Sequence, residues 1–348
     1  TSVAIGNTAG KYKQGLGASS GSGGAIAIGN GAGTGTTLIG QNSNAIAIGS
    51  SSGAIEQGVS AIALGVGSGN GYQGQYSIDV GAGAGQTLQS NNCIAMGYHT
   101  GYTSQSTYCI AIGDEAGETS QNTNSIALGK TAGRYKQGTG SSGGTGGAIA
   151  IGNGAGTGTI SIGQNSNAIA IGTTAGQLTQ GIESIGIGLN AGNDQQSSYS
   201  IALGSGAGKT NQSTRSIGIG YQSGYASLGT DSVCIGSYSG QTSCGNNNII
   251  INASGSDVST TTTSGLFVKP IRQINRSTTN VLQYNTSTSE IVYDNLQAPL
   301  ELTTASDYTN INSNNYYIGC TVQLSHGSLS GGPITLTPST TINLLNGS

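Results

Sequence analysis

The chain has 348 residues, of which 63 are glycine, only 7% are charged and none is tryptophan. Its net charge of -3 excludes the basic footprint of a nucleic-acid binder and gives no reason to expect a polybasic membrane contact. With one phenylalanine, an ordinary core of large side chains cannot be assembled, so the order must come from a repeat held by backbone hydrogen bonds. No apolar run approaches the ~20 residues of a membrane-spanning helix.

One short pattern repeats through the first 256 residues. It reads Ser-Ile-Ala-Leu-Gly-x-x-Ala-Gly at residues 125–133, and the glycine after the apolar triplet returns every 16 residues from Gly49 to Gly129 and from Gly172 to Gly236. We call this glycine the marker. Such a period is typical of a solenoid, whose repeats bury their faces by stacking on one another. It predicts an all-β parallel β-roll, or β-solenoid, of about 15 coils and a shaft of ~70 Å at ~4.8 Å per coil.

Part of the repeat array is duplicated, because residues 124–183 are a near copy of residues 1–60 at an offset of 123. Two coils in each copy are longer than 16 residues. Insertions in a solenoid fall in loops on one face, so the extra residues are expected to bulge from the shaft.

Each apolar triplet alternates large and small side chains. Isoleucine or leucine stands three and one residues before the marker, with alanine between them, which is the alternation of a strand. The large residues are predicted to face into the coil. The alanines are then predicted to form a flat outer strip that contacts another chain: Ala63, Ala95, Ala111, Ala127, Ala170 and Ala202.

Glutamine recurs eight residues after the marker. Identical amides stacked one coil apart can hydrogen-bond along the shaft as a ladder. The predicted ladder consists of Gln73, Gln89, Gln105, Gln121, Gln180, Gln196 and Gln212. A row of substrate-binding amides is the alternative.

The period stops near residue 257. Residues 281–285 and 290–293 are expected to form two strands joined by a Thr/Ser turn. The sequence therefore predicts a shaft over residues 1–256, a linker and β-hairpin neck over 257–296, and a small C-terminal β module over 297–348.

The five cysteines form neither a disulfide framework nor a CxxC pair. Cys93 and Cys109 are one period apart at the same phase, so stacked coils would hold their α-carbons at ~4.8 Å, within the range of a disulfide. Two small residues in a column of serines is the other interpretation, and both stay open at this point.

Little in the chain suggests chemistry. His99 and His326 are isolated, and Asp114, Glu115 and Glu118 fit a solvated turn better than a catalytic pair. We therefore expect no enzyme activity, cofactor or metal. Tyrosines gather in two patches, near residues 98–108 and 221–238. Sequons that would carry sugars in a glycosylating setting stand at Asn211, Asn252, Asn275, Asn285 and Asn346.

The Ser2-Val3-Ala4-Ile5-Gly6 motif and its variants resemble the head repeats of trimeric autotransporter adhesins of the YadA type. That resemblance implies a left-handed β-roll in each chain and three chains side by side. The 16-residue spacing, the Ala-Gly and Gln positions and the junction at residues 265–272 look closer to fibre-like repeat proteins of large algal and other aquatic viruses.

These observations favour a structural fibre of a virion or cell-surface appendage, extracellular and homotrimeric, that attaches to a host-surface glycan or protein. Because open solenoid ends template further strand pairing, an extracellular head-to-tail filament is one alternative. A carbohydrate-active solenoid would concentrate carboxylates on one face, and an ice-binding solenoid would need a flat Thr-x-Thr array. Neither pattern is visible in the sequence.

Overall fold

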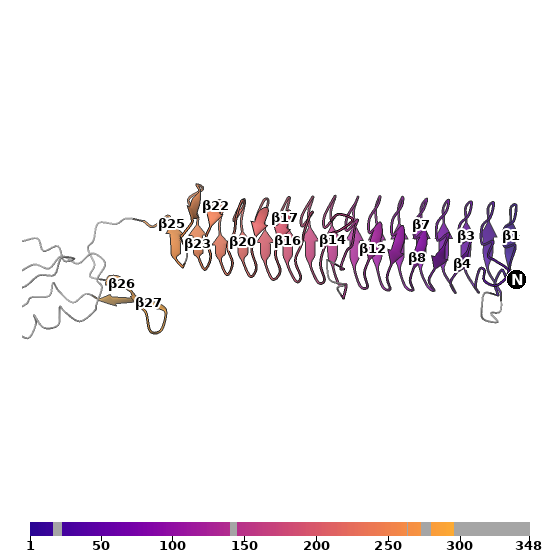
Figure 1. The fold of residues 1–348 in the computed structure, drawn as a ribbon, viewed down its shortest axis with the longest axis horizontal. Helices are drawn as coiled ribbons and strands as arrows, with labels where there is room; N and C mark the ends of the chain where they lie inside the picture. The colour runs from indigo at the N-terminus through magenta and orange to yellow at the C-terminus, as the bar shows by residue number, and fades with distance from the viewer. Residues whose placement is uncertain (17–22, 140–144, 263, 273–279, 296–348) are drawn as a thin grey trace, which may run out of the picture. The chain divides into compact units, whose positions relative to one another are not determined.

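The computed structural model describes residues 1–16, 23–139, 145–262, 264–272 and 280–295. These residues contain no helix, and those up to Ile271 form a parallel β-solenoid of about 15 turns with ~16 residues per turn (Figure 1). The predicted fold class is confirmed. The chain divides into two units, Thr1–Ile271 and Arg272–Ser348, of which the first is the solenoid. Within the described ranges, no helix is long and apolar enough to span a membrane.

The main wall of the solenoid is one parallel sheet to which each coil contributes one strand. Neighbouring strands pair in register, so that Ile110 lies beside Ile126 and Ala111 beside Ala127. In the described residues its sixteen strands are β1 (Val3–Ile5), β2 (Ile26–Ile28), β3 (Ile46–Ile48), β5 (Ile62–Leu64), β7 (Ile78–Val80), β9 (Ile94–Met96), β11 (Ile110–Ile112), β13 (Ile126–Leu128), β14 (Ile149–Ile151), β15 (Ile169–Ile171), β16 (Ile185–Ile187), β18 (Ile201–Leu203), β20 (Ile217–Ile219), β21 (Val233–Ile235), β23 (Ile249–Asn252) and β25 (Leu266–Lys269).

A second, interrupted wall is built from the residues that end at the glutamine position. Its strands are β4 (Glu56–Gln57), β6 (Tyr72–Gln73), β8 (Thr87–Gln89), β10 (Thr103–Gln105) and β12 (Thr119–Gln121), then β17 (Asp194–Gln196) with β19 (Thr210–Gln212), and β22 (Ser239–Cys244) with β24 (Val258–Thr260). These strands also pair in parallel, as Gln105 does with Gln121. In both walls, residues at equivalent positions of successive coils therefore stack directly on one another.

The marker glycine turns the chain at the end of each main-wall strand. Gly113 has a φ of 128°, and a β-carbon on it would lie 2.7 Å from the carbonyl carbon of Gly129 in the next coil. Both the backbone conformation and the space therefore require glycine, because no L side chain tolerates that contact. This explains why the glycine recurs at one phase.

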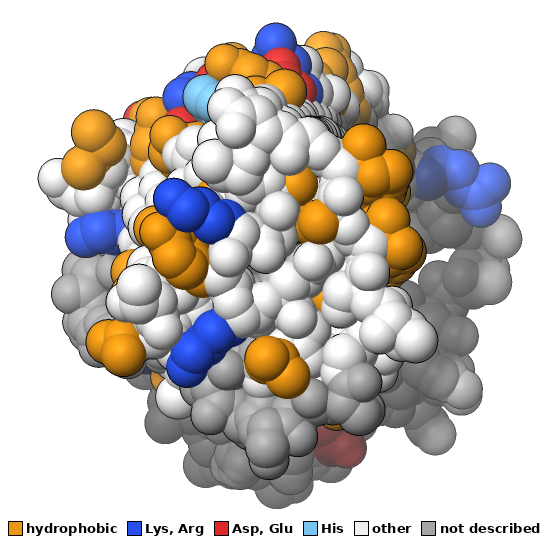
Figure 2. Space-filling view, turned by 90° about the vertical axis from the view of Figure 1, so that its right-hand side faces the viewer, with side chains coloured by type: hydrophobic (Ala, Val, Ile, Leu, Met, Phe, Trp, Pro, Cys, Tyr) orange, Lys and Arg blue, Asp and Glu red, His pale blue; other side chains and the backbone are white. Residues whose placement is uncertain are grey.

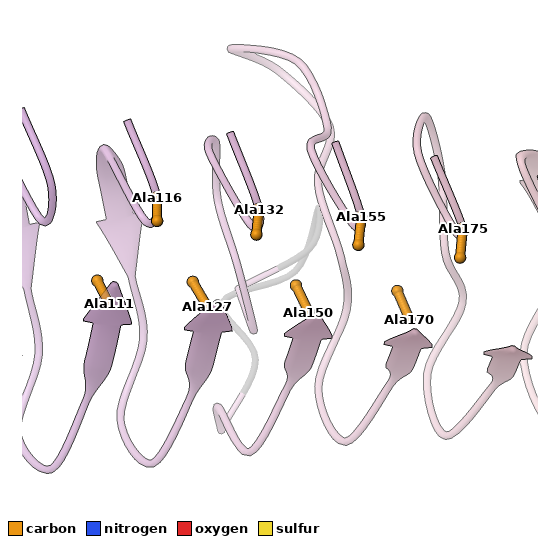
Figure 3. Packing of buried hydrophobic residues seen from close by; sticks show 8 residues of the cluster. All are labelled: Ala111, Ala116, Ala127, Ala132, Ala150, Ala155, Ala170 and Ala175. Carbon is orange, nitrogen blue, oxygen red and sulfur yellow. The ribbon is translucent and has the colours of Figure 1, made fainter. Parts of the chain in front are cut away.

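The interior of the coil is lined by alanine rather than isoleucine. Ala111 and Ala127 have no exposed surface, whereas Ile112 beside them is 40% exposed. Figure 3 shows the row through Ala111 pointing across the interior at a second row, through Ala116, from the turns that follow the marker glycines. The interior is thus narrow enough there for methyl groups to fill it.

The predicted outer alanine strip is therefore wrong. All of its members are fully buried inside the coil: Ala63, Ala95, Ala111, Ala127, Ala170 and Ala202. The strand alternates large and small residues as predicted, but the alanines face inward and the isoleucines outward, because two isoleucines per strand do not fit in so narrow a coil.

One inserted segment in each copy is described in full. At residues 34–40 the chain leaves the wall in a turn that the Thr36 N–H closes on the Ile39 carbonyl, and the equivalent bond joins Thr159 and Ile162. Leu38 at the first turn is 75% exposed and Ile160 at the second is 78% exposed. These segments project as expected.

The shaft extends beyond the predicted limit at residue 256. Strand β25 pairs with β23, and Phe267 takes the inward position that alanine has in other coils. The hairpin predicted for the neck is present as the antiparallel strands β26 (Asn280–Asn285) and β27 (Glu290–Asn295). The module predicted over residues 297–348 lies outside the described residues and stays a prediction.

The duplication covers seven whole coils and extends beyond the near-identical residues 1–60 and 124–183. Residue n corresponds to residue n + 123, so that β1 maps onto β13 and β11 onto β21 without a shift. We call residues 1–123 the first copy and residues 124–246 the second copy. Equivalent residues of the two copies lie seven coils apart, or about 34 Å along the shaft.

Candidate interaction surfaces

The buried glutamines form a ladder in the interior. Gln105 accepts a hydrogen bond of 2.9 Å from the Gln89 amide and donates one of 2.9 Å to Gln121, which donates in turn to Gln137. The amides of Gln105, Gln121 and Gln137 also donate to a carbonyl of the main wall in their own coil, as Gln121 does to Ile110. The ladder ties coil to coil and wall to wall, so it is structural and offers no amide to a substrate.

The ladder is not continuous. The prediction is confirmed for Gln89, Gln105, Gln121 and Gln180, the last of which accepts from Gln164. The remaining predicted members are buried in the same column but donate only to backbone carbonyls: Gln73, Gln196 and Gln212.

One interruption of the ladder has a visible cause. Asp79 replaces the inward alanine of its coil, is fully buried, and accepts a 2.5 Å hydrogen bond from the Gln89 amide. Burial raises the pKa of Asp79 well above its ordinary value. The second carboxyl oxygen of Asp79 and the amide oxygen of Gln73 have no partner among the described residues, which is the arrangement that a protonated carboxyl would satisfy by donating to Gln73.

The outer face of the main wall is apolar along its whole length. In each of its sixteen described strands, both outward positions hold isoleucine, leucine, valine or methionine. These side chains are half-buried by their neighbours along the shaft and exposed at their tips, as Ile112, Leu203 and Ile235 are at about 40% each. We call these two rows the isoleucine strip.

The isoleucine strip is long, straight and free of charge. At ~4.8 Å per strand, sixteen strands span about 70 Å, and the two rows stand about 7 Å apart on each strand. Viewed from the N-terminal end, hydrophobic side chains lie one behind another along the surface of the shaft (Figure 2). A contiguous apolar surface of this kind is typical of a contact with another molecule.

A pair of tyrosines occurs once in each copy at one corner of the coil. In the first copy they are Tyr98 and Tyr102, which enclose the ring of His99 at centroid distances of 3.9 Å and 4.5 Å. In the second copy they are Tyr221 and Tyr225, at the equivalent positions. Tyr98 is 53% exposed and Tyr221 is 48% exposed.

The tyrosine site of the second copy includes hydrogen-bonding groups. The Lys209 ammonium donates a 2.8 Å hydrogen bond to the Tyr225 hydroxyl, and the Gln222 amide donates one of 3.2 Å to the Tyr221 hydroxyl. No other coil marker of the described chain is followed by tyrosine at both of these positions. The corner therefore carries two copies of one aromatic and polar site.

The acidic cluster of the sequence is paired. Asp114 lies 3.2 Å from the Lys130 ammonium, and Arg134 of the same coil contacts both Glu115 and Glu118. These carboxylates form ion pairs between successive coils, as expected for a solvated turn. In the described ranges no three His, Cys, Asp or Glu side chains are grouped so that they could hold a metal ion.

The sequons separate into exposed and buried sites. Asn211 and Asn285 are exposed. Asn252 is 2% exposed, and its amide donates to the carbonyls of Ser237 and Ser256, so the expectation of a sugar there is wrong. Asn275 and Asn346 lie outside the described residues.

The isoleucine strip is the surface that the sequence interpretation missed. The sequence signal for it lies in the other residues of each coil, which are alanine, glycine, serine and glutamine. A coil that buries these residues is too narrow to hold isoleucine as well.

Comparison of the chain with family models, curated proteins and solved structures gives no match.

Proposed function

We propose that the chain is the shaft of a structural fibre in which three copies pack side by side through the isoleucine strip. The observation that carries this proposal is the strip itself, because all outward positions of sixteen described strands are apolar. A solvent-facing sheet would alternate towards polar residues.

A second copy of the same chain is the occupant that fits the strip best. Because the strands repeat at ~4.8 Å, an identical parallel neighbour presents its rows at the same heights over the full length. A strip about 70 Å long and ~10 Å wide would contribute roughly 700 Å² per chain, close to the ~800 Å² per partner of a stable interface. Both sides lack charge, so no ionic group would be desolvated.

The number three and the setting rest on the resemblance to adhesin heads and viral fibre repeats. Three strips meeting on a common axis would shield one another from water. The corners with the tyrosines and ion pairs lie outside the isoleucine strip. Such an assembly suits a long extracellular appendage of a virion or cell, with an end-to-end filament of the same trimers as the alternative.

The mass of the particle in solution tests the proposal. Wild-type protein should sediment as three chains, and the pair Ile112→Lys and Leu203→Lys should yield single chains whose far-ultraviolet circular dichroism is unchanged. Leu178→Lys is the matched control, because Leu178 is 41% exposed but lies outside the strip. A wild-type monomer, or a double variant that remains trimeric, would refute the role of the strip.

Attachment through the tyrosine sites is a second candidate function. The duplication favours it: Tyr98 and Tyr221 are kept in both copies although they are exposed, whereas His99 is replaced by Gln222. Tyrosine rings beside a histidine in the first copy, and beside amide and ammonium donors in the second, suit the apolar face and hydroxyl groups of a sugar. Two sites about 34 Å apart on each chain would allow one polysaccharide to bind twice.

Binding to a printed oligosaccharide array tests this candidate. Wild-type protein should bind at least one glycan, and Tyr98→Ala with Tyr221→Ala should abolish that binding. The control is Tyr76→Ala with Tyr199→Ala, because these tyrosines are also exposed and equivalent in the two copies but lie elsewhere on the coil. Absence of wild-type binding, or equal loss in both double variants, would overturn it.

A further inference from the structure

Four of the five cysteines of the chain are arranged in two pairs inside the coil. Cys93 and Cys109 occupy one phase of successive coils, and Cys234 and Cys244 occupy two phases of a single coil. All four are buried and are free thiols in the structure. The fifth, Cys320, lies outside the described residues.

The first pair is stacked along the shaft. The Ile94 N–H donates a 2.9 Å hydrogen bond to the Cys109 carbonyl, and the Ile78 N–H donates the same bond to Cys93. This ladder holds the two α-carbons at the strand spacing of ~4.8 Å, within the ~4.4–6.8 Å range that a disulfide tolerates. Each thiol also donates to a backbone carbonyl at 2.8 Å, Cys93 to Ser106 and Cys109 to Asn122, so both side chains point the same way.

The second pair converges across the interior. A β-carbon on Gly240 would lie 2.8 Å from the Cys234 sulfur and 3.0 Å from the Cys244 β-carbon. Both side chains therefore meet over one glycine that has no side chain to separate them. The cluster around them is apolar, with Leu228 and Ile250 fully buried. The neighbouring Cys244 thiol and burial raise the pKa of Cys234, so it is a poor nucleophile once the coil has closed.

The duplication shows that the members of each pair change together. Where the first copy has Cys93 and Cys109, the second has Ser216 and Ser232. Where the second copy has Cys234 and Cys244, the first has Ala111 and Gln121. In each pair, both neighbouring positions are cysteine in one copy and neither is cysteine in the other. Cysteines that served only as small buried residues would not be expected to change together in this way.

We propose that Cys93–Cys109 and Cys234–Cys244 are disulfide sites, one joining two successive coils and the other joining the two walls of a single coil. The cross-links form by exchange with a small-molecule or protein disulfide as oxidant while the coils are still open. In each case one S–S bond forms, the S–S bond of the oxidant breaks, and the two thiol protons pass to its two sulfurs. The Cys234–Cys244 bond stands where the glutamine ladder has ended, and it supplies there the wall-to-wall tie that Gln121 supplies in the first copy.

Counting thiols in the full chain tests the proposal. Protein refolded with oxidised glutathione and then denatured should show one reactive thiol before reduction and five after, because four of five cysteines are linked. Peptide mapping should find Cys93 joined to Cys109 and Cys234 to Cys244. Five reactive thiols, or any other pairing, would overturn the proposal.

The duplication also provides folded controls. Cys93→Ser with Cys109→Ser introduces the serines of the second copy, and Cys234→Ala with Cys244→Gln introduces the pair of the first. Each double variant should lose one cross-link and keep the other, so that reduction lowers its melting temperature by less than it lowers that of the wild type. Wild-type protein should melt several degrees lower in dithiothreitol. An equal melting temperature in the oxidised and reduced forms, with four thiols blocked, would contradict a stabilising role.

Discussion

The two copies of the seven-coil unit differ in the interior of the coil and agree in the apolar character of the isoleucine strip. At the outward positions of the main wall every residue of the first copy and its equivalent in the second is apolar, as Met96 and Ile219 are. In the interior the same comparison exchanges Gln105 for Leu228 and Asp79 for Ala202. The coil therefore tolerates several chemistries in its narrow core, while the isoleucine strip stays apolar throughout. A surface that faced water would not be restricted in this way, which is the physical ground for giving it a partner.

The largest effect on stability is expected from a charge placed in the alanine-lined interior of the coil. Ala111→Lys would bury an unpaired ammonium among methyl groups and should lower the free energy of unfolding by about 3–5 kcal/mol. Ile112→Lys, one residue away, should lower the free energy of unfolding far less, because the side chain at this position reaches the surface of the separate chain. Urea unfolding of the two variants at a concentration where the chains are separate compares them. Equal destabilisation would mean that the faces of the strand are not those described.

The 16-residue period of the sequence predicts the stacking of the coils but not which face of each strand lies inside. The marker glycines and in-phase glutamines predicted the coil, the parallel pairing and much of the ladder, because a repeated backbone must stack like upon like. The alternation at Ile110, Ala111 and Ile112 predicted two faces but not which one is inside. That choice depends on the width of the coil, which is set by both walls together. The ion pairs likewise arise only when coils are stacked, and the convergence over Gly240 arises only when the two walls of one coil meet.

The ladder can be broken by giving the first copy a residue of the second. Gln105→Leu copies Leu228 and leaves the Gln121 amide oxygen without its donor and the Gln89 amide without one of its acceptors. Each buried group that loses its partner should cost about 1–3 kcal/mol, measured by urea unfolding. In the second copy, Leu228→Gln should also destabilise, because an amide would enter the apolar cluster with Cys234 and Ile250. A neutral Gln105→Leu would show that the ladder contributes nothing.

Removing the buried carboxyl should have the opposite sign. Asp79→Ala copies Ala202 and should raise stability at neutral pH by about 1–3 kcal/mol, because burial raises the pKa of Asp79, so that a carboxyl charged in the unfolded chain must take up a proton on folding.

The pH dependence identifies the cause. The folded-state pKa of Asp79 lies above its unfolded value, so wild-type stability should fall as pH rises from the unfolded value near 3.8 through the raised one. Asp79→Ala and Asp79→Asn should both lack this fall, and the advantage of Asp79→Ala should therefore grow as the pH rises above the unfolded value. Parallel stability curves for the wild type and Asp79→Ala would contradict a protonated Asp79.

The smallest effect concerns a left-handed position in strands β8 and β19 of the second wall, which the two copies fill with different residues. Leu88 has a φ of 56° and is 52% exposed, and its equivalent in the second copy, Asn211, has a φ of 51°. Asparagine tolerates this left-handed conformation better than leucine, so Leu88→Asn should stabilise the shaft by about 1 kcal/mol. Leu178→Asn is the control, because Leu178 is also exposed but is not among the residues with positive φ. If both variants shift the urea midpoint alike, the gain comes from solubility of the side chain and not from the backbone. A gain at Leu88 alone would show that the second copy holds the less strained residue at this position.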